Sequence, residues 1–193
     1  MGSPGYRYRS VVLSPLGSME RILFGVNIDD YLALDLAGIG VLNDAVGGVE
    51  VTCLETINNL CVEGEKKTLR GKEAQLYVQY RDTTKFNSDE SRRARQIQYA
   101  RAFAAKAMSE FGGNPFNALG LLGSVKDFAC TNIGMSEMVE LYGKLENVSP
   151  DLKDEDIRVL EGEAVMGERY MEYRLDETAA FETLLEVLYE EQN

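Results

Sequence analysis

Four arginines lie close together in the middle of the sequence: Arg81, Arg92, Arg93 and Arg95. A guanidinium carries five N–H donors in a planar fork that matches two oxygens of a phosphate at once. The last three arginines fall at the start of a predicted helix, where free backbone amides and the positive end of the helix dipole also favour an anion. These residues therefore predict a site for a phosphate or a pyrophosphate.

A helix from Asp89 to Phe111 must position these arginines, with Asn87 or Ser88 available as N-cap and Gly112-Gly113 as the stop. With 3.6 residues per turn, one stripe of the helix is apolar and is expected to pack against a sheet: Ile97, Ala100, Ala104, Ala107, Met108 and Phe111. An adjoining stripe borders that buried edge and consists of Asp89, Arg92, Gln96 and Tyr99.

Arg93 projects in the apolar direction of this helix and therefore needs a carboxylate or a bound anion, because a guanidinium keeps its charge and burying a bare charge is costly. The alternative interpretation of the whole group is a solvated charged face in which Asp89 and Glu90 pair with the arginines. The neighbouring aromatic residues fit core packing as well as ligand contact: Tyr77, Tyr80, Phe86 and Tyr99.

Charge is unevenly distributed along the chain. The 193 residues carry a net charge of -12, yet residues 66–106 contain eleven basic residues against four acidic ones. The net charge disfavours general binding to nucleic acid or to an anionic membrane, because phosphate groups would repel the chain. The basic stretch instead favours local binding of an anion.

Two residue types limit the chemistry further. The sequence contains no histidine, which excludes histidine-dependent triads and histidine metal sites. Three cysteines, at irregular spacing, are too few for a zinc site or a disulfide scaffold. Cys53 and Cys61 are eight residues apart, and they either close a hairpin in an oxidising compartment or are two buried thiols.

The length and a hydrophobic content of 45% predict one globular domain over residues 18–193, after a tag or irregular segment over residues 1–17. No apolar run reaches the roughly 18 residues of a membrane span. Strands are expected at 31–36, 49–54, 157–160 and 170–174, and helices at 18–25, 39–46, 71–80, 89–111, 115–128, 136–145 and 176–191. Ser18 is expected to cap the first helix and Gly25 to end it, and Gly47-Gly48 are expected to end the second. This order predicts an α/β (α+β) fold with a central mixed β-sheet flanked by helices.

The run from Gly71 to Gln96, GKEAQLYVQYRDTTKFNSDESRRARQ, resembles the signature of the LytR-CpsA-Psr (LCP) family. That signature reads G-x-x-A-L-x-Y-V-R-x-R, then a variable loop, then D-x-x-R-x-x-R-Q. Residues 31–51 resemble the family's strand, helix and Gly-Gly-Val segment, and residues 131–132 and 162–189 its C-terminal part. The resemblance covers nearly all of the chain from about residue 18 and implies an LCP-like fold.

The resemblance implies a phosphotransferase of the bacterial cell envelope, extracytoplasmic and membrane-anchored in its full-length form. Such enzymes move a teichoic-acid- or capsule-type glycopolymer from polyprenyl pyrophosphate to peptidoglycan, with Mg²⁺ assisting. By motif position, the expected catalytic residues are Arg81, Asp89, Arg92 and Gln96. The expected pyrophosphate contacts, with Arg93 added from the helix projection, are Arg81, Arg92, Arg93, Arg95 and Gln96. A groove for the polyprenyl tail is expected at Ala100, Phe103 and Ala104, with close helix packing as the alternative.

Two departures from the family pattern keep other functions open. Gln79 stands where the family has the first arginine of R-x-R. The family's N-terminal strands, with the acidic Mg²⁺ ligand and an Arg-Asp motif, are not found, so the chain is expected to be the C-terminal two thirds of the domain. One alternative is a non-catalytic polyprenyl-phosphate or anion-binding module, or a regulator of the kind once called a transcriptional attenuator. A DNA-binding regulator is disfavoured by the acidic last 43 residues, with fourteen acidic and four basic residues.

Overall fold

The computed structural model describes residues 16–84, 88–111, 115–145, 153, 156–168 and 171–188. The chain comprises two compact units, one formed by residues 1–29 with 152–193 and the other by residues 30–151. All four arginines of the predicted anion site belong to the larger unit. The described part of the chain has no helix of the length and apolar character needed to cross a membrane.

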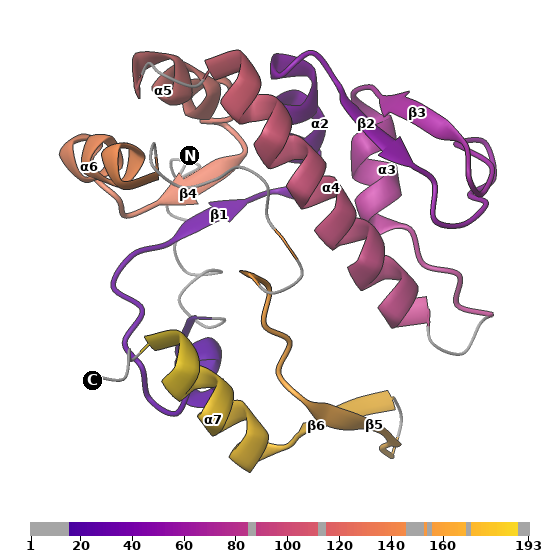
Figure 1. Cartoon of the computed structure of the whole chain (residues 1–193), viewed down its shortest axis with the longest axis vertical. Coiled ribbons are helices and arrows are strands. Elements are labelled where there is room, and N and C mark those ends of the chain that lie inside the picture. The colour runs from indigo at the N-terminus through magenta and orange to yellow at the C-terminus, as the bar shows by residue number, and fades with distance from the viewer. Residues whose placement is uncertain are drawn as a thin grey trace, which may run out of the picture. The chain divides into compact units, whose positions relative to one another are not determined.

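The larger unit contains both strands and helices, with three helices in succession after β3. Its described elements are β1 (Leu32–Leu34), α2 (Leu36–Ala45), β2 (Val49–Thr52), β3 (Lys66–Leu69), α3 (Lys72–Gln79), α4 (Ser88–Phe111), α5 (Pro115–Ser124), β4 (Ala129–Thr131) and α6 (Met135–Leu145). The long helix α4 runs along this unit, with α3, β2 and β3 on one side of it (Figure 1). The helix that carries the arginines is therefore braced along its length by a hairpin and a second helix.

All three strand pairs among the described residues are antiparallel. β1 pairs with β4, and β2 pairs with β3. In the smaller unit β5 (Gly162–Met166) pairs with β6 (Met171–Leu175). The α+β class is thus confirmed. The expected central mixed sheet is replaced, in the residues described, by three two-stranded antiparallel sheets of short strands.

The core of the larger unit lies among β2, β3, α3 and α4. Along β2, Val49 and Val51 are buried while Glu50 and Thr52 are exposed, as expected for a strand with one face against a core. The buried apolar residues are Val46, Val49, Val51, Cys53, Ile57, Leu60, Cys61, Leu69, Ala74, Tyr77, Val78 and Tyr99. Tyr99 is the buried member contributed by α4, and partly buried apolar side chains of the same helix pack against this core: Ala102, Phe103, Ala107 and Phe111.

Asn43 is a fully buried polar residue that joins four elements. Its Nδ2 donates to the Leu69 carbonyl (2.8 Å), and its Oδ1 accepts from the Val49 amide (3.3 Å) and the Tyr99 hydroxyl (3.2 Å). A buried amide without partners would destabilise the fold, so these bonds fix the relative positions of α2, β3, β2 and α4.

The turn after α2 depends on glycine. Gly47 and Gly48 have φ angles of 79° and 91°, a region that residues with a Cβ rarely adopt, and they end the helix as the sequence predicts. Gly40 has a different role: a Cβ placed there would lie 2.8 Å from the Gly71 carbonyl oxygen. The absence of a side chain at Gly40 therefore lets α2 approach the start of α3 closely.

The smaller unit contains a helix over residues 16–22, the β5–β6 hairpin and α7 (Glu177–Leu188). The rings of Phe24 and Phe181 pack edge to face with centroids 5.3 Å apart, and Asp176 caps α7 by accepting from the Thr178 amide. Gly25 follows the first helix with a φ of 85°, which confirms the predicted stop. The predicted cap is wrong, because Ser18 lies inside that helix.

Several expected elements differ from the structure. The strand expected at 157–160 is wrong: these residues have no regular structure, and β5 begins two residues later, at Gly162. The sequence did not predict β3, because two of its four residues are lysines and only Leu69 is buried. The expected cap Asn87 and the Gly112-Gly113 stop of α4 lie outside the described residues, as does Phe86.

Candidate functional site

Three predicted catalytic residues meet at the start of α4. The Asp89 carboxylate lies between two guanidiniums, with Oδ2 2.8 Å from Arg81 Nη2 and Oδ1 2.7 Å from Arg92 Nη2. Arg81 Nε also donates to the Ser88 hydroxyl (3.1 Å). Together, Arg81, Asp89 and Arg92 are called the Arg81–Asp89–Arg92 cluster. Residues from a loop and from the first turn of α4 thus converge on a single carboxylate.

The cluster is accessible to solvent. The side chains of Arg81, Asp89 and Arg92 are 42%, 57% and 38% exposed. Exposed ion pairs of this kind contribute about 0–1 kcal/mol to stability, because water screens the charges. A bound phosphate could therefore replace the carboxylate as the anion between the guanidiniums at little cost to the fold, with additional support from the positive end of α4.

Gln96, the fourth predicted catalytic residue, points toward α3. Its Nε2 donates to the carbonyl of Val78 (3.1 Å). α3 ends without a glycine, and the chain becomes extended at Tyr80 with φ -53° and ψ 139°. The carbonyls of a helix's last turn have no partners within the helix. The Gln96 amide satisfies one of them and ties α4 to the segment that leads into Arg81.

Arg95 is fully buried beside Gln96. Its Nε donates to the Tyr77 carbonyl (3.0 Å), its Nη2 donates to the Tyr80 carbonyl, and its Nη1 forms an ion pair with the Glu55 carboxylate. The guanidinium carbon also lies 5.2 Å from the centre of the Tyr80 ring. Burial lowers the pKa of Arg95, yet a guanidinium stays charged at neutral pH, so Glu55 is the buried counter-ion.

The expected orientation of α4 is wrong in its first half. Arg93 is exposed, and the guanidinium that enters the interior and needs a carboxylate is that of Arg95. The residues of α4 that are buried are Ser88, Arg95 and Tyr99. The projection took its apolar direction from Ile97, Ala100 and Ala104, whereas the residues buried in this half of the helix include Arg95 and Tyr99.

The expected stripes are otherwise placed as follows. Ala107 and Phe111 pack against the core, as predicted, whereas Ala100 is exposed. Phe103 and Ala104 are half-buried, and the Phe103 ring stacks on Tyr99 with centroids 6.2 Å apart. The stripe of Asp89, Arg92, Gln96 and Tyr99 borders the buried edge, since Tyr99 is buried, Arg92 is half-buried and the other two are exposed.

The tyrosines near the arginines belong largely to the core. The Tyr77 hydroxyl donates to Gln98 Oε1 (2.6 Å), and Gln98 Nε2 donates to the Thr52 carbonyl (2.9 Å). Burial raises the pKa of Tyr77, and burial together with the nearby Asp44 carboxylate raises the pKa of Tyr99. Both hydroxyls are therefore neutral near pH 7 and serve as packing and hydrogen-bonding groups.

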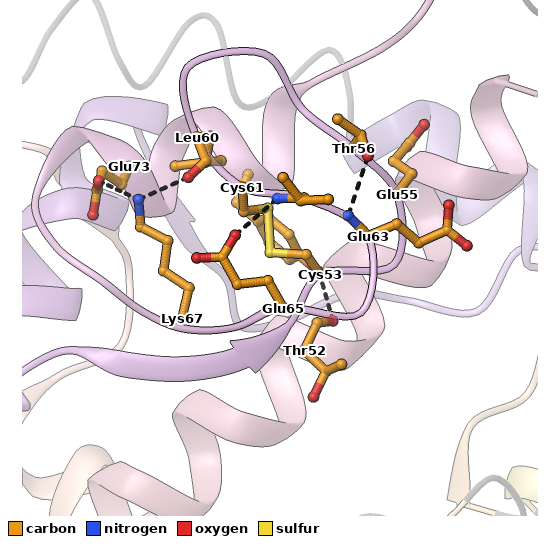
Figure 2. Close-up of a disulfide and its surroundings, with 12 residues drawn as sticks. Thr52, Cys53, Glu55, Thr56, Leu60, Cys61, Glu63, Glu65, Lys67 and Glu73 are labelled. Atoms are coloured by element: carbon orange, nitrogen blue, oxygen red, sulfur yellow. Dashed lines mark hydrogen bonds and ion pairs between the residues drawn. A yellow bond between two sulfur atoms is a disulfide. The ribbon is translucent and has the colours of Figure 1, made fainter.

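A disulfide joins Cys53 and Cys61, whose Cα atoms are 6.4 Å apart (Figure 2). The bond between these two cysteines, one of the two interpretations of the pair, is therefore present, both residues are buried, and Cys130 is the free thiol. Glu55 lies within the loop that the disulfide closes. Sequence reasoning missed Glu55, because a lone glutamate forty residues before Arg95 carries no signal that it will pair with that arginine.

The described residues contain no group of three histidine, cysteine, aspartate or glutamate side chains that could hold a metal ion. The Asp89 carboxylate, the one acidic group of the cluster, has both oxygens bound by arginines. Asp89 is therefore engaged by the two guanidiniums in this arrangement and is not placed as a magnesium ligand.

Comparison with known proteins gives a family and a fold. The model of the LytR_cpsA_psr family matches residues 19–186. A structure of a transcriptional regulator from Enterococcus faecalis is similar with a TM-score of 0.71 and 22% identity, over 90% of this chain and 64% of that one. No curated protein matches the chain.

Two further solved structures share the fold. TagV of B. subtilis has a TM-score of 0.66 and 20% identity, over 90% of this chain and 68% of that one. A structure described as TagT bound to LI-WTA has a TM-score of 0.65 and 17% identity, over 95% of this chain and 68% of that one. The chain thus spans about two thirds of the length of these structures, and the LCP-like fold is confirmed.

Proposed function

Since the chain belongs to the LytR-CpsA-Psr family, we propose that it binds the pyrophosphate of a polyprenyl-linked cell-wall glycopolymer. In the full-length protein, we propose, this binding leads to transfer of the polymer to peptidoglycan. The similar structure of TagT bound to LI-WTA, a wall teichoic acid, supports a teichoic-acid-type polymer, and a capsule-type polymer is compatible with the same chemistry.

The observation that carries the proposal is the Arg81–Asp89–Arg92 cluster. Two guanidiniums already bind one anionic group at 2.7 and 2.8 Å, and they are exposed at the start of a long helix. A pyrophosphate offers more charge and more oxygens than a carboxylate, so it competes well for the same donors. Arg93 contributes positive potential from the surface in this proposal, whereas the charge of Arg95 is balanced by Glu55.

The proposed reaction is an in-line displacement at phosphorus. A peptidoglycan sugar hydroxyl forms a bond to the phosphorus that carries the polymer, while the bond from this phosphorus to polyprenyl phosphate breaks and that group leaves with the electron pair. The hydroxyl proton passes to Asp89, once the phosphate has displaced it from the arginines, or to water. Such reactions depend mainly on positioning and on stabilising phosphate charge, which is the role of Arg81 and Arg92.

Gln96 has an indirect role in this proposal, because its amide is bound to the Val78 carbonyl and holds the segment before Arg81. The implied Mg²⁺ would neutralise further phosphate charge when bound, and no step here depends on it. A groove for the polyprenyl tail at Phe103 and Ala104 stays part of the proposal.

An extracytoplasmic location with a membrane anchor in the full-length protein is also proposed. The disulfide between Cys53 and Cys61 supports an oxidising compartment, because such bonds are rare in the cytosol.

The alternative function is binding of polyprenyl pyrophosphate without transfer, and Gln79 favours it. This residue is exposed at the end of α3, where its Oε1 accepts from Gln75 Nε2 (3.4 Å), and it supplies a neutral amide where the family signature has an arginine. One cation fewer weakens the stabilisation of charge that develops during transfer more than it weakens binding of the ground state.

The test is attachment of labelled glycopolymer to peptidoglycan by the full-length protein. We expect Arg92→Ala and Gln96→Ala to lower attachment at least tenfold, since each removes a group that binds or orients phosphate donors. Lys106→Ala is the matched control, because it removes one charge from the same helix at a residue paired with Glu110 (2.7 Å). Unchanged attachment in Arg92→Ala would contradict the proposal, and binding of the lipid by wild type without attachment would favour the alternative.

A further inference from the structure

We propose that Glu55 is a positioning residue for the pyrophosphate site, and that the disulfide loop exists in part to hold it there. Glu55 acts through Arg95, which fixes the end of α3 and thereby the place of Arg81. The choice of pyrophosphate as the ligand rests on the proposed function, whereas the contacts among Glu55, Arg95 and the end of α3 do not.

The loop that carries Glu55 is held in place by covalent and hydrogen bonds. It is closed by the disulfide between Cys53 and Cys61, and the amide of Ile57 donates across it to the Cys61 carbonyl (2.9 Å). The amide of Cys53 donates to the Glu65 carbonyl (2.8 Å), which anchors the loop to the residue before β3. Because the loop is closed and tied in this way, the backbone at Glu55 has little freedom.

An ion pair joins this loop to α4, and hydrogen bonds from the same arginine extend the link to α3. The Glu55 carboxylate is only 14% exposed and pairs with Arg95, which is fully buried. Arg95 in turn donates to the carbonyls of Tyr77 and Tyr80, at the negative end of the α3 dipole. Without the carboxylate the interior would hold a bare charge, so the guanidinium would turn toward water and release these carbonyls.

The Tyr80 carbonyl links these contacts to the Arg81–Asp89–Arg92 cluster. Tyr80 is followed directly by Arg81, so a shift of the Tyr80 carbonyl moves the Arg81 backbone and pulls its side chain from Ser88 and Asp89. Arg92 has no such dependence, because it and its partner Asp89 lie on the same helix, three residues apart. Loss of Glu55 should therefore affect Arg81 and spare Arg92.

This difference can be measured with inorganic pyrophosphate as the probe, by calorimetry at a temperature where every variant is folded by circular dichroism. Glu55→Gln should weaken binding about tenfold, as expected for the loss of charge-assisted hydrogen bonds from one guanidinium. The control Glu63→Gln removes the same charge from an exposed residue of the same β2–β3 connection, beyond the disulfide, and should leave binding unchanged. Glu55→Asp, which keeps the charge on a shorter side chain, should recover part of the loss.

A pair of double-mutant cycles separates positioning from general weakening. In an Arg81→Ala background Glu55→Gln should cost little more, since the group it positions is gone. In an Arg92→Ala background its effect should remain about tenfold, because the two changes act independently. Equal, fully additive losses in both backgrounds would overturn the inference.

A readout without ligand keeps the inference testable by itself. The Nε–Hε resonance of Arg81 in a nitrogen–proton NMR spectrum should move toward that of a free arginine in Glu55→Gln and stay in place in Glu63→Gln. Reduction of the wild-type disulfide should move it in the same direction, which supplies the result if Glu55→Gln does not fold.

The possible failures are distinguishable. An Arg81 resonance that stays in place in both Glu55→Gln and the reduced protein would overturn the positioning role, whatever the affinity for pyrophosphate. A resonance that moves in a protein whose wild type binds no pyrophosphate would support positioning and contradict the proposed function.

Discussion

Helix α4 presents arginines in two environments that differ in burial rather than in chemistry. Arg95 is fully buried and pairs with Glu55, a residue of a distant loop. Arg92 is 38% exposed and pairs with Asp89, its neighbour on the same helix. Both are arginine–carboxylate pairs, yet only the exposed one can exchange its carboxylate for a ligand without leaving a charge in the interior.

The difference separates support from binding. Breaking a buried ion pair leaves one charge without water or partner, which lowers the free energy of unfolding by several kcal/mol. Breaking an exposed pair changes that free energy little, since water solvates the charge that is left. The buried pair therefore holds α3 and α4 in register, and the exposed cluster of Arg81, Asp89 and Arg92 is left to bind anions.

The largest expected effect is at the buried pair. Arg95→Met should lower the free energy of unfolding by about 3–5 kcal/mol, because Glu55 is left buried without its partner. Urea denaturation followed by circular dichroism measures this. Arg92→Met is the matched change on the exposed side and should cost at most about 1 kcal/mol. Equal losses in the two variants would remove the distinction between the environments.

The disulfide should come next. Cys53→Ser combined with Cys61→Ser should lower stability by about 2.5 kcal/mol, the loop-entropy value for a closure of eight residues. Wild type measured in reductant should give the same value as the double variant. A double variant as stable as oxidised wild type would show that the loop holds Glu55 without its cross-link.

Tyr99 extends the comparison to a buried hydroxyl. At pH 7, Tyr99→Phe should cost about 1 kcal/mol, through the lost hydrogen bond to Asn43. Burial raises the pKa of Tyr99 above its ordinary value of 10.0, so the folded state keeps a proton that the unfolded state loses. Stability from this group is complete below about pH 10 and is lost as the pH rises above it, by up to about 1.4 kcal/mol per pH unit.

Urea denaturation of wild type and Tyr99→Phe between pH 8 and about 11 checks this sign, because ionisation of an ordinary tyrosine falls in that range. Tyr77, whose pKa is also raised by burial, stays in both proteins. The variant should therefore lose stability less steeply than wild type above pH 10. Parallel curves would contradict the burial argument for Tyr99.

The smallest effect on stability is expected at Asp89. Asp89→Asn should change the free energy of unfolding by less than about 1 kcal/mol, because both of its ion pairs are exposed. The same urea experiment measures it. A loss as large as that of Arg95→Met would mean that the cluster supports the fold and is not free to exchange its anion.

The sequence predicted much of this arrangement. Spacing along one helix was enough to place Asp89 and Arg92 on one stripe, and closeness in sequence added Arg81 from the preceding segment. Glycine stops, such as Gly47 after α2, were also readable, since a positive φ favours glycine strongly. These features depend on local geometry, which a single sequence reports well.

Features that depend on distant partners were not predictable. A helical projection cannot show that the buried residue is Arg95 and not Arg93, because the answer lies in the carboxylate of Glu55 forty residues earlier. The pairing of β2 with β3 was missed for a related reason: Lys67 is held by the Leu60 carbonyl and by Glu73, contacts that no alternating pattern encodes.

The central claim, that the Arg81–Asp89–Arg92 cluster binds a lipid-linked pyrophosphate, is tested most directly by calorimetric titration with a polyprenyl pyrophosphate. Wild type and Lys106→Ala should bind equally well, since Lys106 lies on the same helix away from the cluster and pairs with Glu110. Arg92→Ala should bind at least tenfold more weakly, the loss expected for a charge-assisted hydrogen bond. Equal affinities in wild type and Arg92→Ala would contradict the account.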